Sequence, residues 1–373
     1  MTIKKLSLGI IKEGKIPIDR RVPLTPEQVA ELHSQYPSVR VKCQRSDIRC
    51  FTDEAYANAG AELCDEVSDC DIILGVKEVP LDMLAENKTH FFFSHTIKKQ
   101  SYNRPLLQAI LTKKVRLIDW ECLTDPQGRR LIAFGRYAGI VGAYNAILTF
   151  GKRYNLFHLR PAHQCHDLDD LKTEYQKALL PKIKIVLTGG GRVAKGAIEV
   201  LAGMNIRRVS PGELLHEVYE EPVFAQLNSR DYHQRKDGAA FDRDDFYANP
   251  SNYQGDFLKF AQKADVLIAG AYWDPEAPVL FTKEDMTHLD FKLRVIADIT
   301  CDIDGSIPST KRSTVIEDPV YDYNPDNDRE EPPFTDEGNI TVMAVDNLPC
   351  ELPRNASQDF GQEFLKHILP NLL

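Results

Sequence analysis

The sequence lacks the features that mark membrane, secreted and nucleic-acid-binding proteins. Its apolar runs, such as residues 266–271, are far too short to span a bilayer. Residues 1–5 lead into a strand-like stretch and then into charged residues, so we expect no signal peptide and a cytoplasmic location. The net charge is −9 and no basic stripe stands out, so we expect neither a nucleic-acid nor a membrane partner.

The cysteines are not spaced as in metal-binding or redox motifs. The eight cysteines include no C-x-x-C pair, so neither a zinc ribbon nor a redox dithiol is supported. Without an export signal they should stay reduced, and most should be packing residues. A cluster of His158, His163, Cys165 and His166 fits no standard zinc spacing. We therefore expect no metal site.

The chain does contain alternating strand-like and helix-like segments, which predict an α/β fold with parallel sheets. Its 373 residues favour two domains. Strands are predicted at residues 6–11, 39–42, 72–76, 90–94, 115–119, 183–187, 206–209, 266–271 and 294–299. Helices are predicted at residues 25–32, 105–111, 139–154, 194–201 and 359–369. The last helix is expected to fold back onto the first domain. Residues 210–259 are polar and read as an insertion or a long connection, and residues 317–333 as an acidic, proline-rich loop.

A dinucleotide fingerprint follows the strand predicted at residues 183–187. Gly189, Gly191 and Ala194 match G-x-G-x-x-G/A, in the strand–turn–helix context that the motif requires. Glycine lets backbone N–H groups approach a pyrophosphate at the positive end of the helix. The residues expected to bind the cofactor here are Gly189, Gly190, Gly191, Arg192 and Val193. The alternative is a glycine-rich turn that binds nothing.

The choice between NAD and NADP depends on the strand after the fingerprint. An NAD site usually has Asp or Glu at the end of the second strand. Here the strand at residues 206–209 carries Arg207 and Arg208 and is followed by Ser210, with no acid until Glu213. Two arginines and a serine suit a 2′-phosphate, which favours NADP slightly, unless both arginines are plain surface residues.

Four segments of the first third carry side chains suited to catalysis. Arg20 and Arg21 precede a helix start, and arginine is suited to bind carboxylates. Lys77 and His95 each follow a predicted strand, and Glu121 follows the next one. Open α/β sheets bind ligands at the carboxyl ends of their strands, so these groups should meet there. A desolvated lysine is a usable base, and histidine titrates near neutrality.

Seven segments resemble the alanine dehydrogenase/saccharopine dehydrogenase superfamily. The nearest likeness is to the lysine–ketoglutarate reductase part of bifunctional aminoadipate semialdehyde synthases, and it spans nearly the whole chain. In chain order the segments are RRVPLTP (20–26), LGVK (74–77), FFSHTIK (92–98), RLIDWE (116–121), AFGRYAG (133–139), DITCDIDGS (298–306) and VDNLPCELP (345–353). The bifunctional enzymes carry a second, saccharopine-cleaving region, which we do not expect here because the sequence ends at Leu373.

The resemblance implies two Rossmann-like domains with an interdomain cleft. The expected substrate domain is residues 1–137 with 346–373, and the dinucleotide domain is residues 138–345 with a polar insertion near 210–260. It also implies NAD(P)-dependent condensation of L-lysine with 2-oxoglutarate to saccharopine, or the reverse oxidation. Lys77 and His95 match the acid/base pair, and Arg21 matches an arginine that binds substrate carboxylate.

Saccharopine carries three carboxylates, so several cations should line the cleft. Expected substrate-binding residues are Arg20, Arg21, Lys98, Lys99, Glu121 and Arg136. Asp298 and Asp346 are candidates on the cofactor side, although Asp298 and Asp302 might equally cap a turn. Imine formation needs a base for the substrate ammonium, carbinolamine collapse needs an acid, and the dihydronicotinamide supplies hydride.

Two other functions remain open at this point. An alanine dehydrogenase-like enzyme would use the same lysine, histidine and arginine but would need fewer cations for one small carboxylate. A catalytically silent nucleotide-binding homologue would be expected to have lost the acid/base pair, yet Lys77 and His95 are both present. In each case we expect small-molecule ligands, and the sequence does not indicate an oligomeric state.

Overall fold

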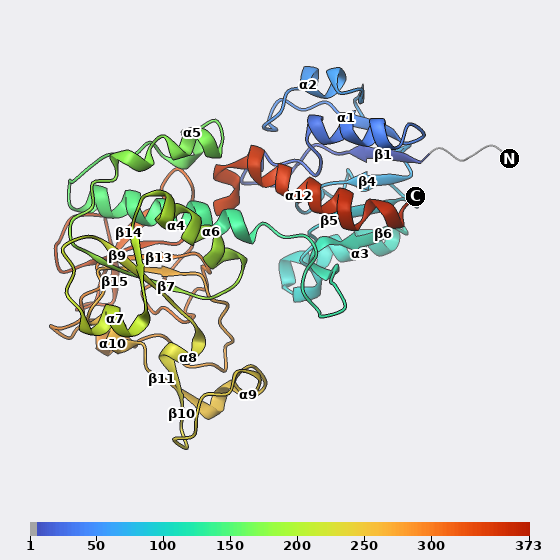
Figure 1. Cartoon of the computed structure of the whole chain (residues 1–373). Coiled ribbons are helices and arrows are strands. Elements are labelled where there is room, and N and C mark those ends of the chain that lie inside the picture. Colours follow the sequence, from blue (N-terminus) through green and yellow to red (C-terminus); the bar gives the residue numbers. More distant parts are fainter. Residues whose placement is uncertain (1–5) are drawn as a thin grey trace. The chain divides into compact units, whose positions relative to one another are not determined.

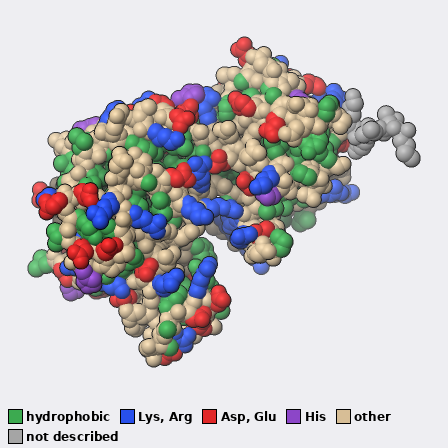
Figure 2. Space-filling model, in the orientation of Figure 1, with side chains coloured by type: hydrophobic (Ala, Val, Ile, Leu, Met, Phe, Trp, Pro, Cys, Tyr) green, Lys and Arg blue, Asp and Glu red, His purple; other side chains and the backbone are tan. Residues whose placement is uncertain are grey.

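The computed structural model describes residues 6–373, and it divides into two compact units. Unit 1 comprises Met1–Phe134 with Pro353–Leu373, and unit 2 comprises Gly135–Leu352 (Figure 1). Residues 1–5, on which the expectation of no signal peptide rests, lie outside the described residues. Acidic and basic side chains occur on both units on the face shown in Figure 2. Among residues 6–373, no helix combines the length and the apolar character needed to cross a membrane.

Unit 1 is built on six parallel strands in the order β3-β2-β1-β4-β5-β6. From β1 the strands follow one another towards one edge of the sheet, and from β4 towards the other edge. The carboxyl ends of β1 and β4 therefore form the switch point at which open α/β sheets bind ligands. The strands are β1 Ser7–Ile10, β2 Arg40–Gln44, β3 Glu62–Cys64, β4 Ile72–Leu74, β5 Thr89–Phe92 and β6 Arg116–Asp119.

Helices cover the sheet of unit 1 and close its core. Thr25 begins α1 with a capping box, accepting from the backbone N–H of Gln28 while the Gln28 side chain bonds back. Trp120, the largest fully buried side chain, packs edge-to-face on Phe360 of the last helix, with ring centroids 5.1 Å apart. The C-terminal segment therefore completes this core. The helices of unit 1 are α1 Pro26–Gln35, α2 Asp53–Asn58, α3 Arg104–Thr112 and α12 Pro353–His367.

Unit 2 has an eight-stranded sheet in the order β15-β14-β16-β13-β12-β7-β9-β8. The sheet is mixed: β14 runs antiparallel to β15 and β16, and the other paired strands run parallel. The expected loop at 317–333 is wrong in part. Val320, Tyr321 and Tyr323 bury their side chains and form a strand despite the surrounding acids and prolines. The strands are β7 Lys184–Thr188, β8 Arg207–Val209, β9 Val223–Leu227, β12 Val266–Ala269, β13 Val295–Asp298, β14 Val320–Asn324, β15 Arg329–Glu331 and β16 Ile340–Met343.

The segment read as a polar insertion at 210–260 contains a central strand. β9 lies between β7 and β8, so the strand that follows the fingerprint in sequence is not the strand beside it in space. The short helix α7 connects β8 to β9. The polar residues around the short apolar run Val223–Leu227 made the whole segment look like an insertion. Only the later part, a two-stranded hairpin of β10 (His233–Arg235) and β11 (Tyr253–Gly255), lies outside the main sheet.

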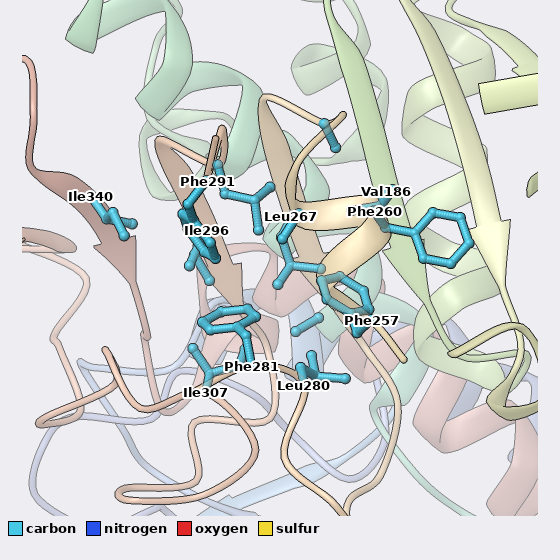
Figure 3. Close-up of a cluster of buried hydrophobic side chains, with 14 of the residues drawn as sticks. Val186, Phe257, Phe260, Leu267, Leu280, Phe281, Phe291, Ile296, Ile307 and Ile340 are labelled. Carbon is cyan, nitrogen blue, oxygen red and sulfur yellow. The ribbon is translucent and has the colours of Figure 1, made fainter. Parts of the chain in front are cut away.

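One hydrophobic cluster fills the face of the unit 2 sheet that carries α10. Figure 3 shows Leu267 and Ile296 from neighbouring strands with Phe257, Phe281 and Phe291 around them. These side chains are buried, and their aromatic bulk anchors short helices that have little intrinsic stability of their own. The helices of unit 2 are α4 Gly135–Arg153, α5 Leu168–Lys172, α6 Arg192–Gly203, α7 Pro211–His216, α8 Ser229–Tyr232, α9 Arg243–Ala248, α10 Leu258–Ala261 and α11 Lys283–Met286.

Candidate functional site

The switch point of unit 1 holds Lys77, just beyond the end of β4. The carboxylate of Glu13, beyond the end of β1, accepts from the backbone N–H groups of Val76 at 2.7 Å and Lys77 at 2.9 Å. The indole N–H of Trp120 donates to the carbonyl of Gly75 at 2.9 Å. Contacts from β1 and β6 therefore fix the backbone on which Lys77 is mounted.

The surroundings of Lys77 favour its neutral form. Burial lowers its pKa, and the nearby charges of Arg21 and Lys15 lower it further, while Asp19 and Glu78 act in the opposite direction. A lysine with a lowered pKa accepts a proton at a pH where an exposed lysine cannot. The predicted base therefore lies in an environment that suits a base.

His95 lies beyond the end of β5 and is paired with the residue next to Lys77. Its backbone has φ 54 and ψ 9, a left-handed conformation that is uncommon outside glycine. The ring Nδ1 lies 2.5 Å from Glu78 Oε1, and Lys15 Nζ lies 2.8 Å from Glu78 Oε2. Burial would raise the pKa of Glu78, but its bonds to His95 and Lys15 outweigh burial and hold the pKa at about 2. The structure thus pairs His95 with Glu78, the residue that follows Lys77 in the chain.

Arg21 forms an ion pair with Asp19, and its charge acts on Lys77. Its Nε and Nη2 donate to Asp19 at 3.0 and 2.5 Å, both side chains are 1% exposed, and Phe134 lies under the guanidinium at 4.0 Å. That Arg21 binds a substrate carboxylate stays a prediction, and the structure adds that its guanidinium is buried and paired with Asp19. Burial would raise the pKa of Asp19, but Arg21 outweighs it and holds the pKa well below its usual range.

The remaining predicted substrate residues fall into two groups. Arg20, Lys98 and Lys99 are exposed in unit 1, and Glu121 accepts from Arg130 at 2.6 Å. Arg136 instead belongs to unit 2, where it forms a two-bond ion pair with Glu199 of α6, at 2.8 and 2.7 Å. The structure therefore does not bring Arg136 to Lys77 within one unit.

The fingerprint of unit 2 forms a turn that fits a pyrophosphate. Gly189 has φ +102, which non-glycine residues rarely adopt, and a Cβ there would lie 3.1 Å from the backbone of Ala271. A Cβ on Gly191 would meet nothing within 4 Å, so the space over the first turn of the 12-residue helix α6 is open. Open backbone N–H groups at a helix N-terminus are what a dinucleotide phosphate requires. Arg192 and Val193 are the first two residues of that helix.

The ribose end of this site differs from the one expected. On one side of β7 lies β9, which carries no acid, ends with Gln226 and Leu227 and is followed by Asn228. Gln226 donates to the Gly189 carbonyl at 2.8 Å and accepts from Arg208 at 2.6 Å. Arg208 therefore reaches the fingerprint from the outer strand β8, through a glutamine that sequence reasoning missed.

Of the two acids predicted on the cofactor side, Asp298 caps a turn. Asp298 is 1% exposed and accepts from the hydroxyls of Thr300 at 2.6 Å and Thr310 at 2.7 Å and from two backbone N–H groups. Of the two roles considered for it, the structure shows the turn cap, and burial raises its pKa. Asp346 is exposed in the turn after β16. Among the described residues, no group of three or more His, Cys, Asp or Glu could hold a metal ion.

Sequence reasoning also missed Glu13, Asp19 and Glu78 as members of the site. Glu13 is 9% exposed and its pKa is raised to about 8, by burial first and by Asp19 second, against its two backbone N–H bonds. Only their positions in the sequence could have indicated these acids. Each of these acids lies within a few residues of a predicted strand end or beside a predicted site residue.

The fold and the two sites define a two-unit α/β protein with a dinucleotide-type turn in one unit and an acid/base cluster in the other. Residues 9–141 match the alanine dehydrogenase/PNT N-terminal domain, and residues 178–371 match the alanine dehydrogenase/PNT C-terminal domain. The chain belongs to this family, as the resemblance of its motifs predicted.

Individual relatives agree with the family. The chain is 32% identical to alpha-aminoadipic semialdehyde synthase of Arabidopsis thaliana over 95% of its own length and 37% of that protein. It is 27% identical to saccharopine dehydrogenase [NAD(+), L-lysine-forming] of Neurospora crassa, over 94% and 88% of the two chains. A solved L-alanine dehydrogenase shares the fold, with a TM-score of 0.63, 18% identity and coverage of 98% and 90%. The chain thus spans well under half of the plant synthase.

Proposed function

We propose that this chain is a nicotinamide-dependent oxidoreductase that condenses L-lysine with 2-oxoglutarate to saccharopine, or oxidises saccharopine in reverse. The observation that carries the proposal is the Lys77–Glu78–His95 cluster, in which Glu78 follows Lys77 in the chain and bonds His95 at 2.5 Å. The names of the relatives in Arabidopsis thaliana and Neurospora crassa support the same substrate class.

Each residue of the cluster has a task in this chemistry. Neutral Lys77 takes a proton from the substrate ammonium, which frees the amine to add to the keto carbon. The resulting carbinolamine loses its hydroxyl as water when His95 donates a proton, leaving an imine between the two substrates. Glu78 holds the imidazole through Nδ1 and leaves the other ring nitrogen to transfer the proton.

The cofactor and the substrate carboxylates require further groups. A bound dihydronicotinamide supplies the hydride that reduces the imine carbon. The turn Gly189–Gly191 and the start of α6 hold the pyrophosphate. The exposed cations Arg20, Lys98 and Lys99 attract the carboxylates of the two substrates. The charge of Arg21 lowers the pKa of Lys77, and the charge of its partner Asp19 acts in the opposite direction.

NADP(H) is the cofactor favoured by the residues at the ribose end. Arg208, Ser210 and Arg230 line an open pocket beside Gln226 and Asn228. The two acids that also line it cap helices: Glu213 accepts from the Ser210 backbone at 2.7 Å, and Asp231 accepts from the Asn228 backbone at 2.7 Å. Guanidinium and hydroxyl groups suit a 2′-phosphate, and each of the two carboxylates that line this pocket already accepts a backbone hydrogen bond.

A spectrophotometric assay tests the proposal. Oxidation of NADPH and NADH is followed with lysine plus 2-oxoglutarate, and separately with pyruvate plus ammonia. We expect turnover with the first pair. Turnover with pyruvate and ammonia alone assigns an alanine dehydrogenase-like activity instead. Cofactor binding without turnover by either pair assigns a silent nucleotide-binding homologue.

A further inference from the structure

The helix α3 of unit 1, labelled in Figure 1, exposes apolar side chains that the proposed chemistry does not use. Leu107 is 42% exposed and Leu111 is 69% exposed, whereas Leu106 and Ile110 are buried in the core of the unit. Four exposed residues occupy positions i, i+3, i+4 and i+7 and so share one face of the helix: Arg104, Leu107, Gln108 and Leu111. This face is open to a partner.

The same part of the sequence is strongly basic. Residues 87–118 contain seven lysines and arginines and no aspartate or glutamate. Arg104 begins the exposed face of α3, Lys114 follows the end of the helix, and both are exposed. Tyr102, in the short turn η2 (Ser101–Asn103) that leads into α3, is 63% exposed. We call this surface the α3 face, comprising Tyr102, Arg104, Leu107, Gln108, Leu111 and Lys114. Apolar groups beside positive charge fit a partner that offers an apolar group among carboxylates.

A surface of opposite charge lies in unit 2. Residues 326–337, here called the acidic segment, contain six acidic residues and one basic residue. Some of these acids pair with cations of the same unit. Asp326, Asp336 and Glu337 are exposed and form no ion pair with any residue that the structure describes. Their charge is therefore available to a partner.

An aromatic side chain lies within the acidic segment. Phe334 is 36% exposed and has φ 67, a left-handed conformation in which a bulky residue is strained. Its backbone N–H donates to the buried carboxylate of Asp322 at 2.9 Å. Arg153 donates to three backbone carbonyls of residues 336–339, at 2.7 to 3.0 Å. These bonds hold the turn in place, so Phe334 is presented among carboxylates by a fixed backbone.

We propose that the α3 face of one copy of this chain binds the acidic segment of a second copy. In this contact Phe334 packs on Leu107 and Leu111, and the carboxylates of the segment pair with the cations at the two ends of the face. Each copy has a net charge of −9, so two copies repel one another overall. Association is favoured only where a local positive surface meets a local negative one, which selects these two surfaces. Neither surface contains the Lys77 cluster or the glycine turn.

Sedimentation velocity over a range of protein concentrations tests the contact. We expect the unmodified protein to self-associate as its concentration rises, and to do so less in about 0.5 M salt, which screens charges beyond a few ångströms. One double variant, Arg104→Glu with Gln108→Glu, makes the α3 face acidic. The other, Asp326→Lys with Glu337→Lys, makes the acidic segment basic. Each alone should weaken association about tenfold or more.

Mixing the two double variants in equal amounts gives the sharpest result. Every altered surface then meets a surface of opposite charge on the other variant, so association should return, which also shows that both variants are folded. Phe334→Gly removes the aromatic ring and relieves the left-handed strain, so it should weaken association without lowering the thermal midpoint. Val218→Glu, at a residue of unit 2 that is 88% exposed and outside both surfaces, is the control and should change nothing.

Three results would overturn the proposal. The first is an unmodified protein that stays monomeric at every concentration. The second is association that persists in both double variants, and the third is a mixture that stays monomeric. Flotation with vesicles of phosphatidylserine and phosphatidylcholine covers another occupant of the α3 face. Vesicle binding by a monomeric protein, lost in Arg104→Glu with Gln108→Glu, assigns the face to an anionic membrane surface in place of a second copy.

Discussion

The pKa of Lys77 is set by burial and by four nearby charged residues. Burial lowers its pKa most, and the charges of Arg21 and Lys15 lower it further. Asp19 and Glu78 act in the opposite direction. The backbone under this side chain is fixed by the Glu13 carboxylate. A positioned and partly desolvated amine is what general-base catalysis requires.

Lys77→Met should remove the base without touching the cofactor site in unit 2. General acid–base groups contribute about 10²- to 10⁴-fold, so we expect kcat to fall by that factor. NADPH affinity, measured by fluorescence titration, should stay within twofold of the unmodified protein. Lys114→Met, an exposed lysine in the same unit, is the control. Normal turnover by the Lys77 variant would remove this residue from the mechanism.

Glu78 makes unit 1 sensitive to acid. Its folded pKa of about 2 lies below the ordinary 4.5, so its stabilising effect is complete above about pH 4.5 and is lost as the pH falls towards 2. The effect amounts to at most about 3 kcal/mol. Glu78→Gln should therefore lower the free energy of unfolding at pH 6, and the difference should shrink as the pH falls to 3. Denaturant unfolding at several pH values measures this. A difference independent of pH, or one equalled by the exposed control Glu86→Gln, contradicts it.

Arg208 should distinguish the two cofactors. A charge-assisted hydrogen bond to a 2′-phosphate contributes roughly 1.5–3 kcal/mol, so Arg208→Ala should weaken NADPH binding about 10- to 100-fold and NADH binding little. Arg207→Ala is the matched control, because the neighbouring side chain points to the other face of β8 and pairs with Glu221 at 3.2 Å. Equal losses for NADPH and NADH would assign Arg208 to a structural role through Gln226.

At the residue scale, sequence could place Lys77 and His95 but not their partners. A residue that ends an apolar strand is visible in the chain, and parallel strands bring such ends to one edge. The pairing of His95 with Glu78, or of Arg21 with Asp19, depends on side-chain directions and burial that no spacing encodes. A carboxylate-binding role could be predicted for Arg21, but its burial against Asp19 and Phe134 could not.

Among the elements, the crossing of α4 and α6 has the least space. A Cβ on Gly139 would lie 1.8 Å from the Val193 carbonyl oxygen, and one on Gly196 would lie 2.0 Å from that of Arg136. Both obstacles are backbone atoms, which cannot rotate away. The two helices can pack this closely only because each presents a glycine to the other. The first turn of α6 is the proposed phosphate site.

Gly196→Ala should therefore destabilise unit 2 and move its cofactor turn. Overpacking of this kind costs about 1–3 kcal/mol or more, so we expect a lower thermal midpoint and weaker NADPH binding. The control is Gly212→Ala in α7, where a Cβ meets nothing within 4 Å and alanine is the better helix former. Calorimetry compares them. An unchanged midpoint for Gly196→Ala would show that the helices can separate without cost.

Sequence patterns located most elements but not their order. Apolar runs such as Ile72–Leu74 and Val266–Ala269 identified strands in both units. The strand order could not be obtained this way. The chain passes from β7 through α6 to β8 at the edge of the sheet and then returns to place β9 between them, and no apolar pattern indicates this. The strand beside β7 is therefore β9 and not β8, which carries Arg207 and Arg208. The choice between NAD and NADP then depends on Arg208 together with Gln226, which accepts a hydrogen bond from it.

At the scale of the whole molecule, the proposed function divides chemistry and cofactor recognition between the units. Lys77, Glu78 and His95 belong to unit 1, and the glycine turn belongs to unit 2. Each unit has its own hydrophobic core, so a substitution in one site need not unfold the other. This separation is what allows binding and turnover to be measured as independent consequences of the variants above.

The reaction product tests the central claim most directly. The protein is incubated with L-lysine, 2-oxoglutarate and NADPH deuterated at the transferring carbon, and the products are analysed by mass spectrometry. We predict one compound that contains both carbon skeletons, joined with loss of water, and that carries one deuterium on the former keto carbon. Alanine formed from pyruvate and ammonia, with no joined product from lysine and 2-oxoglutarate under the same conditions, would contradict the account.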